Sequence, residues 1–316
     1  MSPASLAPGT RVEVEVPASS ANLGPGFDSV GLALGVWDHC VVTVTDRPGV
    51  VVEVTGEGDD SVPLDATHLV VRTMLRAWSE LGAEPPAGLH LSCRNAVPHG
   101  RGMGSSATAI VTGITAAHAL LAAARGGADL LDLDFANDLA ARLEGHPDNA
   151  SASVFGGATL SWADDGGAGT RTVRLPLHHD IVPVVFAPAE QLSTAKARSV
   201  LPAAVRLGDA AANSARAALL VHALGADPAY LLAATREWLH QEPRRSSYAS
   251  SMALVDRLRA AGHAAVISGA GPSVLVLTTT PAVDEVRAAG TDGGWRVLTP
   301  GVPEHGAVAR LLPAAG

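Results

Sequence analysis

Aromatic residues are scarce in this chain of 316 residues, at 3%, whereas hydrophobic residues make up 47% and glycine occurs 33 times. The core must therefore be built mainly from Ala, Val and Leu, which suits helices packed closely on a sheet. Cysteine is almost absent. Cys40 and Cys93 have neither the spacing of a metal site nor the density of a disulfide scaffold, so no zinc site is indicated. We expect both to be small buried side chains of a protein in a reducing compartment.

The chain also lacks an excess of positive charge and any long hydrophobic run. Its formal net charge of −9 argues against nonspecific binding to nucleic acid or to an anionic membrane. No uninterrupted apolar run approaches the roughly 18 residues of a membrane span, and the N-terminus has neither a basic start nor an apolar stretch. We therefore expect a cytoplasmic protein, in which any anionic ligand must meet a local basic site.

A glycine-rich segment opens directly into a run of helix-forming residues. Gly100, Gly102 and Gly104 let the backbone approach a polyanion closely, and the following helix aims its unpaired amides at it. Ser105 and Ser106 add hydroxyls that can cap the helix or reach phosphate or magnesium. The segment is neither a P-loop nor a Gly-x-Gly-x-x-Gly motif. It predicts a phosphate-binding loop, with an ordinary serine-capped loop as the alternative.

Three further segments combine turns with reactive side chains. Segment 17–28 follows a strand and ends in a carboxylate, and segment 268–273 is a tight glycine turn between two strand-like runs. Segment 144–149 places two carboxylates, an imidazole and an amide around a helix end. Magnesium needs only one or two protein oxygens, so Glu144 with a serine would suffice, whereas His146 is expected to be a turn residue. Each segment taken alone is also compatible with a plain turn.

Hydrophobic periodicity predicts a mixed order of strands and helices. Alternation predicts strands at 11–16, around 42–44 and at 50–54, the last two on either side of a turn at Pro48-Gly49, and a further strand is expected at 181–186. The predicted helices span 67–81, 105–124, 133–144, 209–224, 228–240 and 250–261. Because no regular βαβ repeat is present, this order favours an α+β fold. The linker-like composition of 163–170 suggests two domains, spanning 1–165 and 166–316.

Segments 17–28, 98–109 and 267–274 resemble, in this order and separation, the three motifs of the GHMP family of small-molecule kinases. The resemblance spans nearly the whole chain. The Glu-Gly-His-Pro-Asp-Asn element at 144–149 and the stretch 193–202 resemble the homoserine kinases of that family. The resemblance implies an N-terminal nucleotide domain like domain 2 of ribosomal protein S5. It also implies a C-terminal ferredoxin-like α/β sandwich, with the active site between the two.

This resemblance implies an enzyme that uses ATP and Mg2+ to phosphorylate the hydroxyl of L-homoserine for threonine biosynthesis, and it implies a homodimer. The ATP-binding loop would comprise Pro98, His99, Gly100, Arg101, Gly102, Met103, Gly104, Ser105, Ser106 and Ala107. Ser106 and Glu144 would hold magnesium. The substrate would contact Asn22, Asp28, Asn149, Thr194, Arg198, Gly269 and an arginine in a later loop. Asp28, Ser106, Glu144 and Arg198 would form the catalytic set, in which Asp28 orients the substrate and its role as a base stays open.

The chain departs from the homoserine kinase pattern at 242–249. Those enzymes usually carry an arginine followed five residues later by a proline. Ungapped counting places Arg244 on that arginine and Ala249 on the missing proline, with Arg245 as a rival. The departure leaves open a GHMP kinase for another amino alcohol or hydroxy acid. A catalytically silent GHMP-fold ligand sensor is a further alternative, although a protein that only binds has less need of a magnesium pair.

Overall fold

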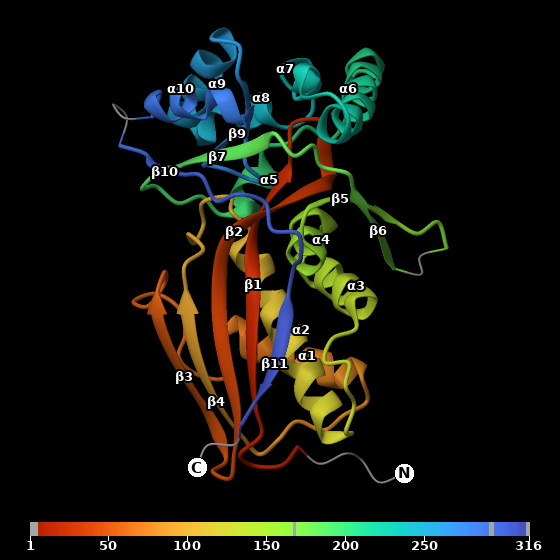
Figure 1. The fold of residues 1–316 in the computed structure, drawn as a ribbon, viewed down its shortest axis with the longest axis vertical. Coiled ribbons are helices and arrows are strands. Elements are labelled where there is room, and N and C mark those ends of the chain that lie inside the picture. The colour runs from red at the N-terminus through yellow and green to blue at the C-terminus, as the bar shows by residue number, and fades with distance from the viewer. Residues whose placement is uncertain (1–5, 167–168, 291–293, 314–316) are drawn as a thin grey trace.

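The computed structural model describes residues 6–166, 169–290 and 294–313, which form two β-sheets with helices packed against them (Figure 1). The first sheet has the order β11-β1-β2-β4-β3, and β5 pairs with β2 and β6. Its strands are β1 (Arg11–Asn22), β2 (Gly26–Thr45), β3 (Gly49–Gly56), β4 (Gly88–Asn95), β5 (Ala158–Ala163), β6 (Thr170–Leu175) and β11 (Val308–Leu312). The second sheet has the order β10-β7-β9-β8. Its strands are β7 (Ile181–Ala187), β8 (Ala264–Ile267), β9 (Val274–Thr279) and β10 (Arg296–Leu298).

Four helices cover one face of the first sheet (Figure 1). They are α1 (Leu69–Glu80), α2 (Ser105–Ala124), α3 (Leu133–Glu144) and α4 (Pro147–Phe155). Alternation along β1 buries Val12, Val14 and Val16 beneath them. Within the described residues α2 alone is long and apolar enough to cross a membrane, but 72% of its apolar window is buried in the structure. It is the central helix of this core.

The second sheet carries the remaining helices, which are shorter on average and include several single turns. They are α5 (Thr194–Ser199), α6 (Leu207–Gly225), α7 (Leu231–Ala234), α8 (Gln241–Arg244), α9 (Ala249–Ala260) and α10 (Val283–Ala288). One hydrophobic cluster contains Leu32 and Leu34 of the first sheet together with Val185 and Leu275 of the second. Because Met103 is fully buried in the same cluster, the glycine-rich segment is anchored where the two sheets meet.

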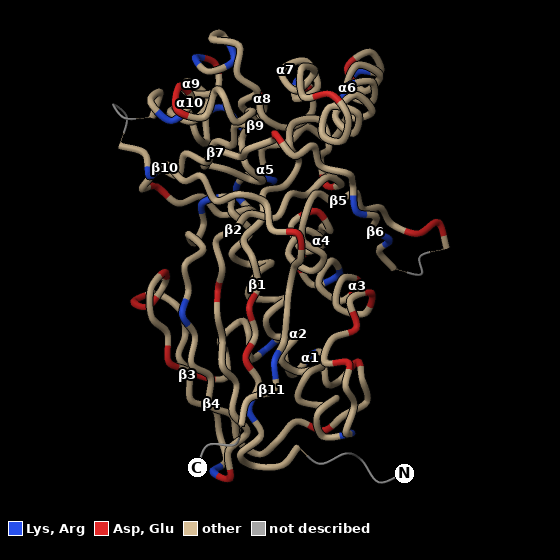
Figure 2. Tube along the Cα trace, viewed as in Figure 1, with Lys and Arg blue, Asp and Glu red and all other residues tan. Residues whose placement is uncertain are grey.

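Charged side chains are distributed along the whole trace. In Figure 2 the Lys and Arg residues do not gather into one patch in this view, and Asp and Glu lie among them.

The α+β class is confirmed, and the predicted helices 105–124 and 133–144 match α2 and α3 residue for residue. The predicted helix 228–240 is wrong beyond Ala234. The Glu237 carboxylate there accepts the N–H groups of the three residues 239–241 at 2.6–2.9 Å, and these local bonds replace a helical ladder. The sequence did not predict helix α4. Its first residue is Pro147, and proline is tolerated at that position because the first N–H groups of a helix have no partner within the helix.

The predicted division at residue 165 remains a prediction. The strands β6 and β11 both lie beyond that residue, yet both join the first sheet. The first sheet therefore contains strands from both sides of the predicted boundary at residue 165.

The two cysteines face each other across β2 and β4, where Cys40 is paired in register with Cys93. Their Sγ atoms lie 3.3 Å apart, and the side chains are 3% and 4% exposed. The hydrogen bond to Cys93, together with burial, raises the pKa of the Cys40 thiol. Because the thiolate is the reactive form, an aromatic disulfide reagent should label the native protein at least about 100-fold more slowly than the denatured protein. Equal labelling rates in buffer and in denaturant would contradict this packing.

Candidate active site

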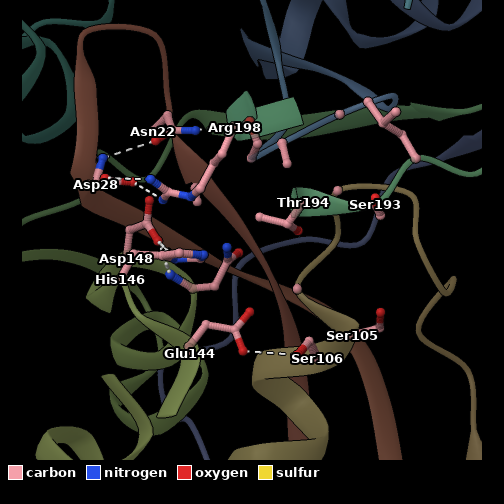
Figure 3. A pocket seen from close by; sticks show the side chains of 18 of the residues that line it. Asn22, Asp28, Ser105, Ser106, Glu144, His146, Asp148, Ser193, Thr194 and Arg198 are labelled. Carbon is pink, nitrogen blue, oxygen red and sulfur yellow. Dashed lines mark hydrogen bonds and ion pairs between the residues drawn. The ribbon is translucent and has the colours of Figure 1, made fainter. Parts of the chain in front are cut away.

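A cavity of about 240 Å³ lies where the two sheets meet, and it collects most of the predicted site residues (Figure 3). Those that line it are Asn22, Asp28, Gly100, Gly102, Gly104, Ser105, Ser106, Glu144, Asn149, Thr194, Arg198, Arg244 and Gly269. The remaining members of the predicted loop, Pro98, His99, Arg101, Met103 and Ala107, do not line it. The structure thus joins segments that are up to about 250 residues apart in the chain.

The phosphate-loop candidate turns its carbonyl groups away from the cavity. Every carbonyl from His99 to Gly104 accepts a hydrogen bond, and four of the six donors lie outside segment 98–109. The donors, in loop order, are the Arg101 guanidinium, the Leu192 and Ser273 amides, the Ser268 hydroxyl, and the Ser19 and Thr108 amides. Within the described part of the chain, the amides of Gly100, Gly102 and Gly104 have no hydrogen-bond acceptor.

The same three glycines have φ values of 64°, 72° and 73°, a region that residues with a Cβ rarely adopt. A Cβ on Gly102 would lie 2.3 Å from the carbonyl oxygen of Ser268, so space also requires glycine there. The unpaired amides lead directly into α2, whose first amides and positive dipole end point the same way. This arrangement can bind the oxygens of a polyphosphate.

Ser106 and Glu144 meet at the floor of the cavity, where the Ser106 hydroxyl donates to Glu144 Oε2 at 2.9 Å (Figure 3). Glu144 is the last residue of α3, and Gly145 in the left-handed conformation turns the chain into α4. Burial raises the pKa of the Glu144 carboxyl. A carboxylate and a hydroxyl are hard oxygen donors, so this pair fits magnesium, which takes few protein ligands and completes its shell with phosphate and water.

Asp28 and Arg198 form a two-pronged ion pair across the cavity (Figure 3). The distances are 3.1 Å from Nη1 to Oδ2 and 2.5 Å from Nη2 to Oδ1. Asp28 has φ 54°, a left-handed conformation unusual outside glycine, and its amide is held by Asn22 Oδ1 at 3.1 Å. The Asn22 amide group in turn donates to Gly269 O at 2.9 Å, which joins the first predicted motif to the third.

The structure separates the two rival arginines. Arg244 is 1% exposed and lines the cavity, and its Nε donates to Ala197 O of α5 at 2.8 Å. Its buried Nη1 has no hydrogen-bond partner within the described residues. Arg245 lies instead at the surface, where it pairs with Glu242 and Asp256. Of the two, Arg244 is therefore placed to receive an anion in the cavity.

Sequence reasoning missed the pair formed by His146 and Asp148, which lines the cavity beside Glu144. His146 Nδ1 lies 2.8 Å from Asp148 Oδ1. Burial acts to lower the pKa of His146, but the hydrogen bond to Asp148 and its charge outweigh burial, so that the pKa is raised. The proline after His146 was the available signal, because proline is favoured at the first position of a helix and so predicts that a helix begins there, with His146 just before it.

A second cavity of about 230 Å³ was also missed. It shares Ser105 and Ser106 with the first and extends away between β2, β4 and α1. Its wall combines apolar side chains such as Val62 and Leu69 with a few polar groups, among them His68 and Asn95. Such a slot beside a polyphosphate loop suits a flat heterocyclic base.

Comparison with known proteins agrees with this geometry. Residues 68–157 match the family model for the GHMP kinases N terminal domain, and residues 215–293 match that for GHMP kinases C terminal. The chain therefore belongs to the GHMP kinase family. A protein of Streptomyces coelicolor named homoserine kinase is 49% identical over 305 residues, covering 96% of this chain and 95% of the relative. Another so named, from Clavibacter michiganensis, is 44% identical over 97% of this chain and 96% of the relative.

A solved structure gives the same result. The crystal structure of homoserine kinase from Cytophaga hutchinsonii superposes with a TM-score of 0.80 at 26% identity, covering 95% of this chain and 97% of that chain. The relatives thus place the chain on the homoserine kinase branch of the GHMP family.

Proposed function

We propose that this protein transfers the γ-phosphoryl group of ATP to the hydroxyl of L-homoserine, giving O-phospho-L-homoserine for threonine biosynthesis. The observation that carries the proposal is one cavity that holds a polyphosphate loop, a pair of magnesium-type ligands and an acid with two arginines. The near full-length similarity to proteins named homoserine kinase supports the choice of substrate.

The nucleotide phosphates bind the unpaired amides of the loop, and the base enters the second cavity. The Ser106 hydroxyl and the Glu144 carboxylate hold Mg2+. When bound, this ion neutralises charge that develops on the phosphate oxygens. Glu144 is half-buried, and this partial burial strengthens the interaction of its carboxylate with a cation.

The substrate site is complementary to an amino acid that carries both charges. The substrate ammonium replaces Arg198 as the partner of the Asp28 carboxylate. The substrate carboxylate then accepts hydrogen bonds from both Arg198 and Arg244. Asn149 and Thr194 line the same cavity and position the hydroxyl toward the loop. Catalysis then rests on holding the hydroxyl in line with the phosphoryl group.

A panel of alcohols tests the proposal. ADP release is measured with ATP and Mg2+ for L-homoserine, L-threonine, L-serine and homoserine analogues that lack the amine or the carboxylate. Preference for L-homoserine, lost when either charged group is removed, is the expected result. Turnover with another alcohol alone would assign the kinase to a different substrate, and binding of nucleotide without turnover on any alcohol would favour the ligand sensor.

Replacing Arg198 by lysine should raise the KM for homoserine by about 10-fold, because an ammonium cannot reproduce the two parallel bonds of a guanidinium. The KM for ATP should change by less than about twofold, since Arg198 contacts the substrate end of the cavity. Lys196 is exposed on the same helix, so Lys196→Ala is the matched control. An unchanged homoserine KM in Arg198→Lys would remove this residue from the substrate site.

A further inference from the structure

Arg101 belongs to the phosphate loop by sequence, but its guanidinium points out of the loop and away from the main cavity. Nε donates to Pro188 O at 2.9 Å and Nη2 donates to Ala189 O at 3.0 Å. Nη1 lies 3.4 Å from His99 O and 3.5 Å from Glu57 Oε2. The guanidinium therefore donates to two successive carbonyls of a distant segment, to one carbonyl of its own loop and to one carboxylate.

The distant segment leads into the substrate-binding helix. Pro188 and Ala189 follow β7, and the chain continues through Leu192 into α5, which carries Thr194 and Arg198. The Leu192 amide donates to Gly100 O at 2.8 Å, so the segment is tied to the loop at a second point. In Figure 3, Ser193 and Thr194 lie between Arg198 and the start of α2, where the loop ends.

The surroundings of Arg101 favour arginine over lysine. Its side chain is 20% exposed, and the flat guanidinium spans both carbonyls at once, which a single ammonium cannot do. Glu57 is itself held, since its amide donates to Asn95 O at 2.9 Å and its Oε1 receives Arg296 Nη1 of β10 at 3.1 Å. Arg101 is thus fixed from both sheets.

We propose that Arg101 is a positioning residue that couples nucleotide binding to substrate binding. It touches neither ligand. By holding segment 188–193 against the phosphate loop, it makes ordering of the loop by nucleotide also order α5, and with it Arg198. Each ligand then strengthens the binding of the other by the same factor. The identity of the two ligands rests on the function proposed above.

Calorimetry on the full chain tests the coupling. The Kd of a non-hydrolysable ATP analogue with Mg2+ is measured with and without saturating L-homoserine, and the ratio is the coupling factor. We expect a factor of at least about 5 in the unaltered protein and a clearly smaller factor in Arg101→Ala, in which the bond from Leu192 to Gly100 remains. The nucleotide Kd without homoserine should change by less than about threefold in that variant, because the guanidinium does not face the phosphates.

Two further variants make the result specific. Arg257 also donates to a backbone carbonyl, that of Ala289 at 2.9 Å, but far along the chain from the loop, so Arg257→Ala should keep the coupling factor. Arg101→Lys should also lower the coupling factor while keeping the charge, and it replaces Arg101→Ala if that variant does not fold. An unchanged factor in the Arg101 variants, a factor of one in the unaltered protein, or a nucleotide Kd that rises without homoserine would each overturn the proposal.

Hydrogen exchange separates failure of this proposal from failure of the proposed function. Nucleotide alone should protect the amides of 189–199 in the unaltered protein and protect them clearly less in Arg101→Ala. If homoserine does not bind at all, the proposed substrate is wrong, and this protection still tests the link from the loop to α5. Equal protection in both proteins would overturn the link itself.

Discussion

Replacing Glu144 by glutamine is expected to lower kcat by about 100-fold or more, because the variant keeps the size and the hydrogen bond to Ser106 but loses the charge that holds Mg2+. The Kd of homoserine should change by less than about threefold, since the substrate charges meet Asp28 and the arginines instead. Steady-state kinetics gives the first quantity and calorimetry the second. Equal losses in turnover and in homoserine binding would contradict the magnesium role.

The pH dependence of the Mg2+ requirement gives a second test of Glu144, with Glu144→Gln as the comparison. Burial raises the pKa of Glu144, so a proton competes with Mg2+ for this carboxylate at a higher pH than for an exposed glutamate. As pH falls, the protonated fraction grows and the Mg2+ concentration needed for half-maximal activity should rise. This dependence should disappear in Glu144→Gln and persist in the control Glu84→Gln, since Glu84 is exposed. A Mg2+ requirement that does not vary with pH in the unaltered protein would argue against Glu144 as the ligand.

The parts of the molecule that could be predicted from sequence depend on local signals. The glycine loop and α2 follow from residues adjacent in the chain, and so does the end of α3 at Gly145. The ion pair of Asp28 with Arg198 joins residues 170 positions apart, and no local sequence pattern predicts where either side chain points. The resemblance to a kinase family supplied what periodicity could not.

The failures have physical causes. The helix expected over 228–240 ends early because one buried carboxylate, that of Glu237, takes the amides that a helix would use. The second cavity touches the glycine-rich segment only at its edge, through residues such as Ser105 and Ser106, and its other walls come from β2, β4 and the start of α1, which carry no local motif. Arg101 lies within the phosphate-loop motif, yet the direction of its side chain is set by hydrogen bonds to carbonyls of a segment nearly 90 residues away in the chain.

The adjacent pair Arg244 and Arg245 gives the sharpest contrast between neighbouring positions. Arg244→Ala should raise the KM for homoserine by about 100-fold, because a buried guanidinium that faces the substrate carboxylate is removed. Arg245→Ala should change it by less than about twofold, since this side chain makes exposed ion pairs with Glu242 and Asp256. Steady-state kinetics with homoserine as the varied substrate measures both. Similar small effects in the two variants would mean that neither arginine binds the carboxylate.

A loss in Arg244→Ala could also arise from packing, because the guanidinium lies 5.6 Å from the centre of the Phe27 ring and binds α5 through Ala197. The homoserine analogue without a carboxylate separates the two causes. If Arg244 binds the carboxylate, Arg244→Ala should weaken the binding of homoserine far more than the binding of the analogue. The effects of the substitution and of removing the carboxylate should then not be additive. If Arg244→Ala weakens the binding of homoserine and of the analogue equally, its effect arises from a change in the position of α5. Arg244→Lys, which restores charge at the site, should recover part of the loss only in the first case.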